Sequence, residues 1–469
     1  MKYLAIDIGS SFIKYALIDL DNNILKAQNK MRFPKRAMSN DPYCYEVPAE
    51  KIFEKVQKIL STLTEKYENI NGLLLSTQMH GFVYKNNKNN KYKYISWQDN
   101  RCRNKIGQSE QSFVEYLKKK LTQTDLKKTG IHIKPSLGLC NLYQLLYKEE
   151  DEEVTEIFTL GSYIINCLTG NNICHITNAA ALGLTDIIEK DWDKKLIDRL
   201  GFNKLTFPVI AKSDFEVCGL YQINNQTIKV YPDYGDQQTS ILGSLVNYDD
   251  VVLNIATASQ VSKITKNYKR GVYETRPYFS NTFINTVSNL PSGRNIDVFI
   301  EFILDTIKKT TEVEIPYELV WENIKKNYQP KMKHSLEFEM DFFNHIEESE
   351  KGYIKNINQG NFTFNNLISA AFINMAKKYD EAINILIDKE STIRKMVCSG
   401  GVSWNVPQLL DVVSEITGYE YCFSQIPDEI FLGFYRIALI CEGICNDLDS
   451  SNQKALKMLD VWRDENVKK

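Results

Sequence analysis

A hydrophobic strand, a polar turn and a second strand follow one another twice in this sequence, near its start and just past its midpoint. Residues 3–14 can be laid on residues 251–263 so that four pairs match: Leu4 with Leu253, Ile6 with Ile255, Ser10 with Ser259 and Lys14 with Lys263. A few matched apolar positions can arise by chance, but both copies place small polar residues at the turn. A repeat of this length predicts two similar α/β domains facing each other across a cleft.

Later segments support the same division. Helical spacing of apolar residues over 49–68 precedes a short strand, and the same spacing over 364–389 precedes another strand. We place the boundary so that the domains comprise residues 1–246 and 247–469. The charged stretch 305–360 is expected to be a helical surface insertion.

Composition limits the classes of partner. The chain has 469 residues, 43% hydrophobic and 25% charged, with a formal net charge of −2. Such a balance is typical of a globular protein and provides no field for nucleic acid or an anionic membrane. We find no signal-peptide pattern, no long apolar stretch and no CxxC pair among ten cysteines. We therefore expect a cytoplasmic protein without nucleic-acid or membrane partners, as a monomer or homodimer.

Two turns that follow hydrophobic strands are candidate phosphate sites. One contains Gly9, Ser10 and Ser11, and the other contains Thr257. Backbone N–H groups and hydroxyls suit phosphate oxygens, although a single such turn is more often a plain hairpin. Asp7 ends the first strand, where a buried carboxylate is costly without a partner. Mg²⁺ is one suitable partner, and capping of the turn explains Asp7 equally well.

Asp236 precedes an apolar and small-residue run over 240–245 that is typical of a helix. The positive end of that helix would keep the carboxylate ionised. Aspartate is also among the best helix caps, and the two roles are compatible.

Polar groups beside an aromatic ring suit the binding of several sugar hydroxyls. Two segments have this character, with candidate substrate ligands at Gln78, Met79, His80, Trp97, Gln98, Asp99 and Arg101. A structural histidine and a simple turn are the alternatives. The pair Gly400 and Gly401, followed by Asn405, allows close approach to a flat ring or a ribose, or forms only a loop.

Taken in this order, the segments resemble the FGGY carbohydrate kinases, the family of glycerol, xylulose and gluconate kinases. Residues 7–11 resemble the first phosphate motif, residues 235–238 the Gly-Asp-Gln motif, and residues 160–170 a mid-domain motif. Residues 255–257 and 399–405 lie where the second phosphate motif and the adenosine motif belong. Ala256 and Ser399 replace glycines that are common in those motifs.

The resemblance implies two ribonuclease H-like (actin/hexokinase-type) domains around a central cleft, with ATP and Mg²⁺ as cofactors. It implies Asp236 as the catalytic base and Asp7 as the metal ligand. The ATP ligands it implies are Gly9, Ser10, Ser11, Thr257, Gly293, Gly400, Gly401 and Asn405. Residues 97–102 and 290–295 are most similar to the sedoheptulose kinases. Phosphorylation of sedoheptulose is therefore the expected activity, with a xylulose kinase or a non-catalytic sugar- or ATP-binding regulator as alternatives.

Overall fold

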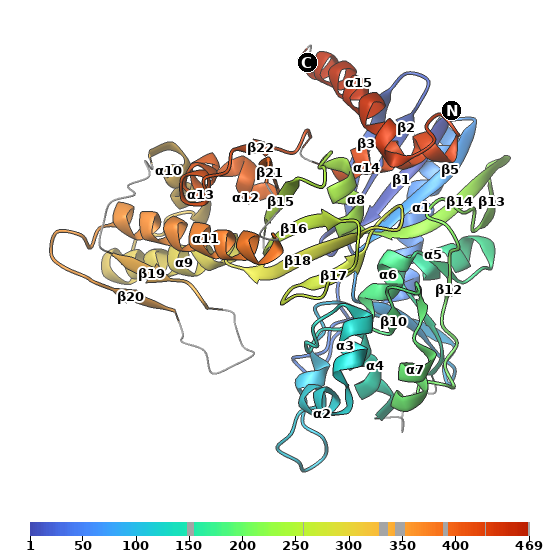
Figure 1. Ribbon diagram of the computed structural model, residues 1–469, viewed down its shortest axis with the longest axis horizontal. Helices are drawn as coiled ribbons and strands as arrows, with labels where there is room; N and C mark the ends of the chain where they lie inside the picture. The colour runs from blue at the N-terminus through green and yellow to red at the C-terminus, as the bar shows by residue number, and fades with distance from the viewer. Residues whose placement is uncertain are drawn as a thin grey trace.

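Two six-stranded mixed sheets organise the chain (Figure 1). The computed structural model describes residues 1–147, 154–256, 258–327, 336–342, 352–387, 393–426 and 428–467. The first sheet has the order β13 (Gly219–Ile223), β14 (Gln226–Gly235), β5 (Ile70–Thr77), β1 (Lys2–Ile8), β2 (Phe12–Asp19) and β3 (Ile24–Arg32). The second has the order β17 (Glu274–Pro277), β18 (Phe283–Leu290), β16 (Ser259–Thr265), β15 (Asp250–Ile255), β21 (Lys395–Ser399) and β22 (Tyr421–Phe423).

The two sheets share one topology, which confirms the predicted repeat. In each, three antiparallel neighbours form one side of the sheet: β1, β2 and β3 in the first, and β15, β16 and β18 in the second, where β17 is added beyond β18. Two later strands then add in parallel to the first strand, β5 and β14 in one sheet and β21 and β22 in the other. Residues 3–8 of β1 are buried throughout, as expected of a central strand covered on both faces.

Helix α1 (Ala49–Lys66) packs on the first sheet through a stripe of buried residues that includes Ile52, Val56 and Leu63. Beside it, a four-stranded sheet is formed by β4 (Glu46–Pro48), β7 (Lys91–Ile95), β6 (Phe82–Asn86) and β8 (Val154–Phe158). The helices of this half are α2 (Phe113–Lys120), α3 (Gln123–Thr129), α4 (Gly138–Tyr147), α5 (Leu160–Thr169), α6 (Ile176–Ala181), α7 (Lys194–Leu200) and α8 (Asp236–Gly243). The remaining elements are a 3₁₀ turn, Arg101–Arg103, and the short pairs β10 (Thr185–Asp186) with β11 (Asp191–Trp192) and β9 (Ile173–Cys174) with β12 (Val209–Ile210).

The second sheet is covered by helices that lie on the left of Figure 1. They are α9 (Gly293–Thr311), α10 (Tyr317–Asn327), α11 (Phe364–Leu386), α12 (Gly401–Asn405) and α13 (Pro407–Thr417). The prediction of a helical surface insertion over 305–360 is wrong in part. Its described residues include a strand pair, β19 (Glu337–Glu339) with β20 (Tyr353–Lys355), and the side chains of Ile324 and Phe338 are buried in the second core.

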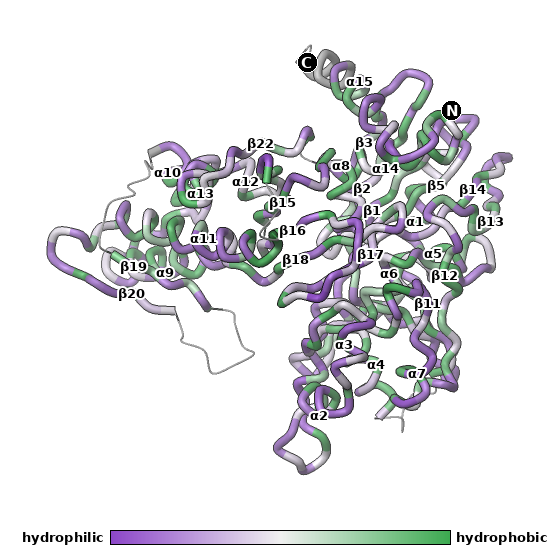
Figure 2. Tube along the Cα trace, in the orientation of Figure 1, coloured by the Kyte–Doolittle hydropathy of each residue, from purple (hydrophilic) through white to green (hydrophobic). Residues whose placement is uncertain are grey.

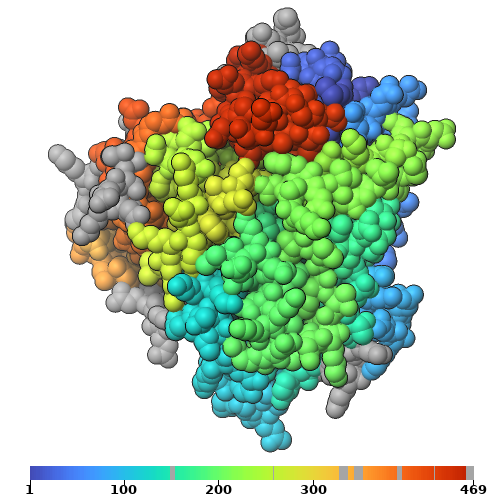
Figure 3. All heavy atoms as spheres, turned by 45° about the vertical axis from the view of Figure 1, so that its right-hand side comes forward, coloured from blue at the N-terminus to red at the C-terminus, as the bar shows by residue number. Residues whose placement is uncertain are grey.

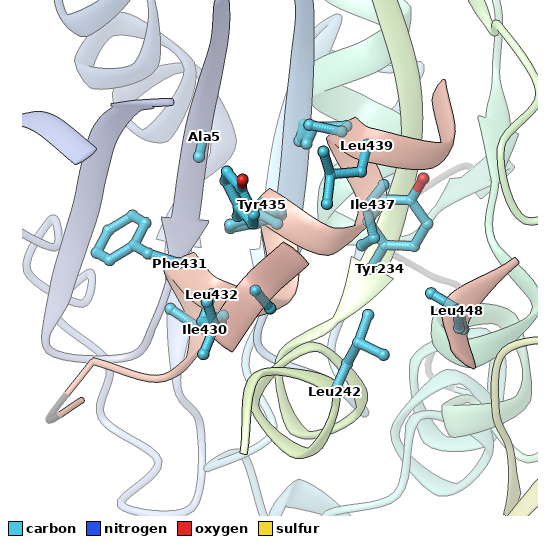
Figure 4. Close-up of a cluster of buried hydrophobic side chains, with 14 of the residues drawn as sticks. Ala5, Tyr234, Leu242, Ile430, Phe431, Leu432, Tyr435, Ile437, Leu439 and Leu448 are labelled. Atoms are coloured by element: carbon cyan, nitrogen blue, oxygen red, sulfur yellow. The ribbon is translucent and has the colours of Figure 1, made fainter. Parts of the chain in front are cut away.

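The C-terminal helices return to the first sheet. Helix α14 (Ile430–Cys441) is almost wholly apolar (Figure 2), and it packs between β1 and α8 together with α15 (Leu448–Val467). The red C-terminal segment therefore lies against the blue N-terminal strands in Figure 3. In Figure 4, Phe431 and Tyr435 of α14 lie toward Ala5 of β1, and Leu242 of α8 belongs to the same cluster. No helix in the described part of the chain is both long enough and apolar enough to cross a membrane.

Candidate active site

Asp236 is the first residue of α8, directly after β14 ends at Gly235, as the sequence predicted. The Gly235 N–H donates to the Thr177 hydroxyl at 2.9 Å, which fixes the turn between strand and helix. The Gln237 N–H donates to Oδ1 of Asp236 at 2.8 Å. The carboxylate is thus oriented by the first turn of its own helix.

Asp7 and Asp236 line one cavity of about 510 Å³, which lies between the two sheets. Burial, followed by the nearby negative charge of Asp7, raises the pKa of Asp236 to about 7. Burial likewise raises the pKa of Asp7 to about 6, although a hydrogen bond from Ser76 at 2.7 Å partly offsets this. Two carboxylates held close in a shielded cleft favour a partner of positive charge or a proton.

Charged residues from the C-terminal part of the chain also line the cavity. The ammonium of Lys14 on β2 pairs with Asp428 at 2.5 Å, and this contact joins residues distant in the sequence. Glu429 is buried beside them, and burial raises its pKa to about 7. Lys14 supplies a cation at the wall of the cavity, where anionic phosphates would be attracted.

Two of the predicted adenosine-side glycines, Gly400 and Gly401, line the opposite wall of the same cavity. Gly400 has a φ of +88°, and a Cβ at this position would lie 2.4 Å from the Ile255 carbonyl oxygen. Gly401 begins α12 and has nothing within 4 Å of its Cβ position. Gly293 begins α9, and its Cβ position is 3.5 Å from the Ala256 carbonyl oxygen. Gly400 is thus required by close packing against the backbone of β15, whereas the open space at Gly401 leaves room for a bound group.

The remaining predicted ATP residues are less well placed. Gly9 and Ser10 form the turn after β1, where the Gly9 N–H donates to the Phe12 carbonyl at 3.0 Å. Ser11 is exposed and lines a separate hollow on the outer surface. Asn405 is exposed, and its amide donates to the Gly401 carbonyl at 2.7 Å. Thr257 lies outside the described residues.

Of the predicted sugar ligands, His80 and Trp97 line a second hollow of about 620 Å³ between the two halves. His80 has a φ of +66°, and its Nδ1 lies 2.9 Å from the Ala181 carbonyl oxygen. Because a carbonyl only accepts, Nδ1 carries the proton and Nε2 is left as an acceptor. Burial, with the nearby charge of Lys134, lowers the pKa of His80 well below its ordinary value, so the ring is neutral.

Gln78 and Met79 are both buried at the end of β5. Gln78 Nε2 donates to the Gly9 carbonyl at 3.4 Å, whereas its Oε1 is buried without a partner in the described chain. The Met79 sulfur lies 2.9 Å from the position a Cβ would take at Gly235. This places the segment directly beside the turn that presents Asp236.

Asp99 and Arg101 are paired with each other. The Arg101 guanidinium donates to both Asp99 oxygens, at 2.8 and 2.7 Å, and also to Glu46 at 2.7 Å. Asp99 is fully buried, and its Oδ2 also accepts from the Tyr45 N–H at 2.6 Å. This network orders the loop that presents Trp97, whereas the Gln98 side chain is exposed. Asp99 and Arg101 thus hold the loop, and the structure does not bring them together with Asp236.

Comparison with known proteins decides the family. Residues 2–243 match a family model described as the FGGY family of carbohydrate kinases, N-terminal domain. The chain belongs to the FGGY family of carbohydrate kinases. A xylulose kinase of Lactococcus lactis subsp. lactis is 25% identical over 279 residues, which cover 55% of this chain and 52% of that protein.

Other FGGY relatives align at similar identity. A sedoheptulokinase of Mus musculus is 20% identical over 342 residues, covering 64% of this chain and 68% of its own length. Glycerol kinase 2 of Sulfolobus acidocaldarius is 26% identical, and the alignment covers 55% of this chain and 53% of that protein. The chain therefore spans about half the length of the first curated relatives it matches.

Solved structures match the whole architecture. A ligand-bound xylulose kinase from Lactobacillus acidophilus superposes with a TM-score of 0.81 at 18% identity, covering 99% of this chain and 97% of its own. A gluconate kinase from the same organism gives the same TM-score, identity and coverage. These matches confirm the predicted fold of two actin/hexokinase-like α/β domains.

The structure also brings to the site residues that the sequence did not single out. Arg276 lies beside Asp236 and contacts Gln237, and Lys14, Asp428 and Glu429 line the same cavity. Lys14 stood out only as a matched position of the repeat. Nothing in the local sequence marks the others, because they meet Asp236 or Asp7 through contacts between distant segments.

Proposed function

We propose that this chain transfers the γ-phosphate of ATP to a hydroxyl group of a ketose, with Asp236 as the general base. The observation that carries the proposal is the position of Asp236 at a helix N-terminus beside Asp7, in the cavity between the sheets. We further propose that residues 1–246 bind the sugar, that residues 247–469 bind the nucleotide, and that the protein is cytoplasmic.

Asp236 accepts the proton of the attacking hydroxyl. With its pKa raised to about 7, the carboxylate is a stronger base than an ordinary aspartate and is still substantially ionised near neutral pH. The transition state of phosphoryl transfer is loose, so that the site contributes mainly by positioning and by stabilising charge. Lys14 and the backbone N–H groups near Gly400 are suited to hold phosphate oxygens from opposite walls.

Asp7 fits a role as a ligand of Mg²⁺. Only one of its two oxygens accepts a hydrogen bond from the described part of the chain, and the residue faces the cavity. No cluster of three or more acidic, histidine or cysteine side chains among the described residues could hold a metal directly. This agrees with a magnesium ion bound by one carboxylate, water and substrate phosphates. Bound there, the ion would neutralise charge on the phosphates.

The sugar is oriented by groups that follow β5 and β7. Neutral His80 offers Nε2 as an acceptor, Gln78 offers its unpartnered Oε1, and Trp97 offers an exposed ring face. An acceptor and an amide that bind hydroxyls, beside an aromatic surface, are typical of sugar sites.

Sedoheptulose is the favoured substrate and sedoheptulose 7-phosphate the product, on the basis of the motifs around Trp97 and Gly293. D-xylulose, phosphorylated to xylulose 5-phosphate, is the alternative, since the relatives include xylulose kinases at slightly higher identity. A sugar- or ATP-binding regulator on the same fold is the third candidate, and the altered glycines at Ala256 and Ser399 favour it.

The test is ADP release by the purified chain with ATP and Mg²⁺ against sedoheptulose, xylulose, ribulose, fructose, gluconate and glycerol. We expect kcat/KM to be largest for sedoheptulose. Preference for another ketose would change only the substrate assignment. Sugar binding without turnover of any of these compounds would contradict the kinase proposal and favour the regulator.

The rate is expected to depend on pH through Asp236. Because the base acts only when ionised, kcat/KM should rise with pH, with a midpoint at about 7. Asp7 and Glu429 titrate in the same cavity, so the observed midpoint belongs to the group of carboxyls. A kcat/KM that is flat between about pH 5 and about pH 8 would contradict a general base of raised pKa.

Replacing Asp7 with asparagine is expected to weaken the response to Mg²⁺. The amide keeps an oxygen but loses the charge, so the Mg²⁺ concentration for half-maximal rate should rise about tenfold or more. Excess Mg²⁺ should restore part of the rate. Asp249→Asn is the control, because Asp249 is an exposed aspartate just before β15. An unchanged Mg²⁺ dependence in Asp7→Asn would exclude Asp7 as a metal ligand.

A further inference from the structure

Arg276 reaches the base from the opposite sheet. It lies on β17, is only 6% exposed, and donates from Nη1 to Oε1 of Gln237 at 2.5 Å. Gln237 follows Asp236 directly in the first turn of α8. The Nε of Arg276 is buried without a partner among the described residues. The guanidinium of Arg276, on the second sheet, thus contacts the residue that directly follows Asp236.

Gln237 connects this cation to the base. Its Nε2 donates to the hydroxyls of Ser262 and Thr286, each at 3.2 Å, on two strands of the second sheet. Its backbone N–H donates to Oδ1 of Asp236 at 2.8 Å. Because Arg276 donates to Oε1, both the oxygen and the nitrogen of the Gln237 side-chain amide are hydrogen-bonded. The first turn of α8, and with it the carboxylate, is therefore fixed to the second sheet.

The charges around Arg276 leave an excess of positive charge. Its Nη2 pairs with buried Glu274, which also faces Lys134 at 3.4 Å. Burial raises the pKa of Glu274, but the charges of Lys134 and Arg276 outweigh this and hold it well below its ordinary value. One anion is thus shared by two cations. Arg276 is the cation of this group that acts on Asp236, where its charge favours the ionised carboxylate.

Among the residues that the structure describes, the other ionisable groups that face Asp236 are negative, neutral or already paired. Asp7 on β1 opposes ionisation of Asp236, whereas Arg276 favours it. Burial raises the pKa of Tyr94 on β7, so this phenol stays neutral, as does the ring of His80. The other charged residues that line the cavity are Lys14, Asp428 and Glu429, and Lys14 is bound to Asp428.

We propose that Arg276 is a positioning residue for phosphoryl transfer, which orients Asp236 through Gln237 and stabilises its ionised form. The inference rests on the proposed function only in assigning Asp236 as the base. A structural role alone does not require this side chain, because a neutral residue would avoid burying an unpartnered Nε. The positive charge of the guanidinium favours the ionised form of Asp236, and its planar set of N–H donors fixes the contact with Gln237.

The test compares two substitutions with a matched control. Arg276→Met removes the positive charge and should raise the midpoint pH on the acidic side of the kcat/KM profile by about one pH unit or more. Arg276→Lys keeps the positive charge but loses the planar guanidinium. The midpoint on the acidic side of the kcat/KM profile should therefore be unchanged, while kcat falls by about tenfold. Arg270→Met is the control, because Arg270 is exposed on the segment before β17 and contacts Gln123 of the first half at 2.6 Å. Its profile should match the wild type.

A second readout does not depend on turnover. The carboxyl of Asp236 is titrated by ¹³C NMR in protein labelled at the aspartate carboxyls, with Asp236→Asn identifying the resonance. The midpoint should rise in Arg276→Met, or in Arg276→Gln should the methionine variant not fold, and should not rise in Arg276→Lys. An unchanged midpoint in both neutral variants, or an equal rise in Arg270→Met, would overturn the inference. Absence of sugar phosphorylation by the wild type would instead refute the proposed function and leave this titration decisive for Arg276.

Discussion

Asp236→Asn is expected to lower kcat by about 10²–10⁴-fold and to leave the affinity for the sugar nearly unchanged. Asparagine keeps the shape of the side chain and its place at the start of α8. It cannot accept the proton of the attacking hydroxyl, so only the transition state loses stabilisation. Steady-state kinetics with the preferred ketose, together with calorimetric titration of the sugar, measure the two quantities separately.

The same substitution should also raise the midpoint of thermal unfolding. Burial and the charge of Asp7 raise the pKa of Asp236 to about 7 in the folded protein, above the value of an unfolded aspartate. A raised carboxyl pKa makes folding progressively less favourable as pH rises from the pKa of an unfolded aspartate, about 4, to about 7, so removal of the charge stabilises the fold at neutral pH. A lower rate in a more stable protein excludes misfolding as the cause. A near-normal kcat in Asp236→Asn would remove this residue as the base.

Gly243→Ala is expected to lower the free energy of unfolding by about 2 kcal/mol or more. Gly243 ends α8, and a Cβ at this position would lie 1.7 Å from the backbone oxygen of Glu429 at the start of α14. Helix propensity alone predicts the opposite sign, since alanine is favoured over glycine by about 1 kcal/mol within a helix. The contact dominates because it involves backbone, which cannot rotate away. The change is measured by denaturant unfolding.

Gly360→Ala is the matched control for this prediction. Its Cβ position has only one neighbour within 4 Å, the Asn358 Oδ1 at 3.5 Å, and its φ lies outside the left-handed range. We expect a change within about 0.5 kcal/mol. Since α8 carries Asp236 at its other end, Gly243→Ala should also reduce kcat. Equal stability of the two alanine variants would show that α8 and α14 do not pack as closely as described.

The local signals in the sequence were sufficient for the strands and turns that surround the site. The buried run of β1 ending in Asp7 and the helix beginning at Asp236 are both confirmed, because each depends on a few consecutive residues. The repeat was visible because strand, turn and strand recur with the same spacing, and the shared sheet topology confirms it.

Contacts between distant segments could not be predicted in this way. The pair of Lys14 with Asp428 joins β2 to the segment before α14, and the bond of Arg276 to Gln237 joins the two sheets. No periodicity or motif marks such pairs. The pairing of Asp99 with Arg101, two positions away, is likewise seen only in the structure.

We propose that the cavity between the sheets transfers phosphate from ATP to a sugar hydroxyl with the help of Asp236. The most direct test is ³¹P NMR of wild-type protein and Asp236→Asn, each incubated with ATP, Mg²⁺ and sedoheptulose. We predict that the wild type produces a sugar phosphate monoester in equal amount to ADP, while Asp236→Asn produces almost none. Formation of inorganic phosphate alone, or equal monoester formation by both proteins, would contradict the account.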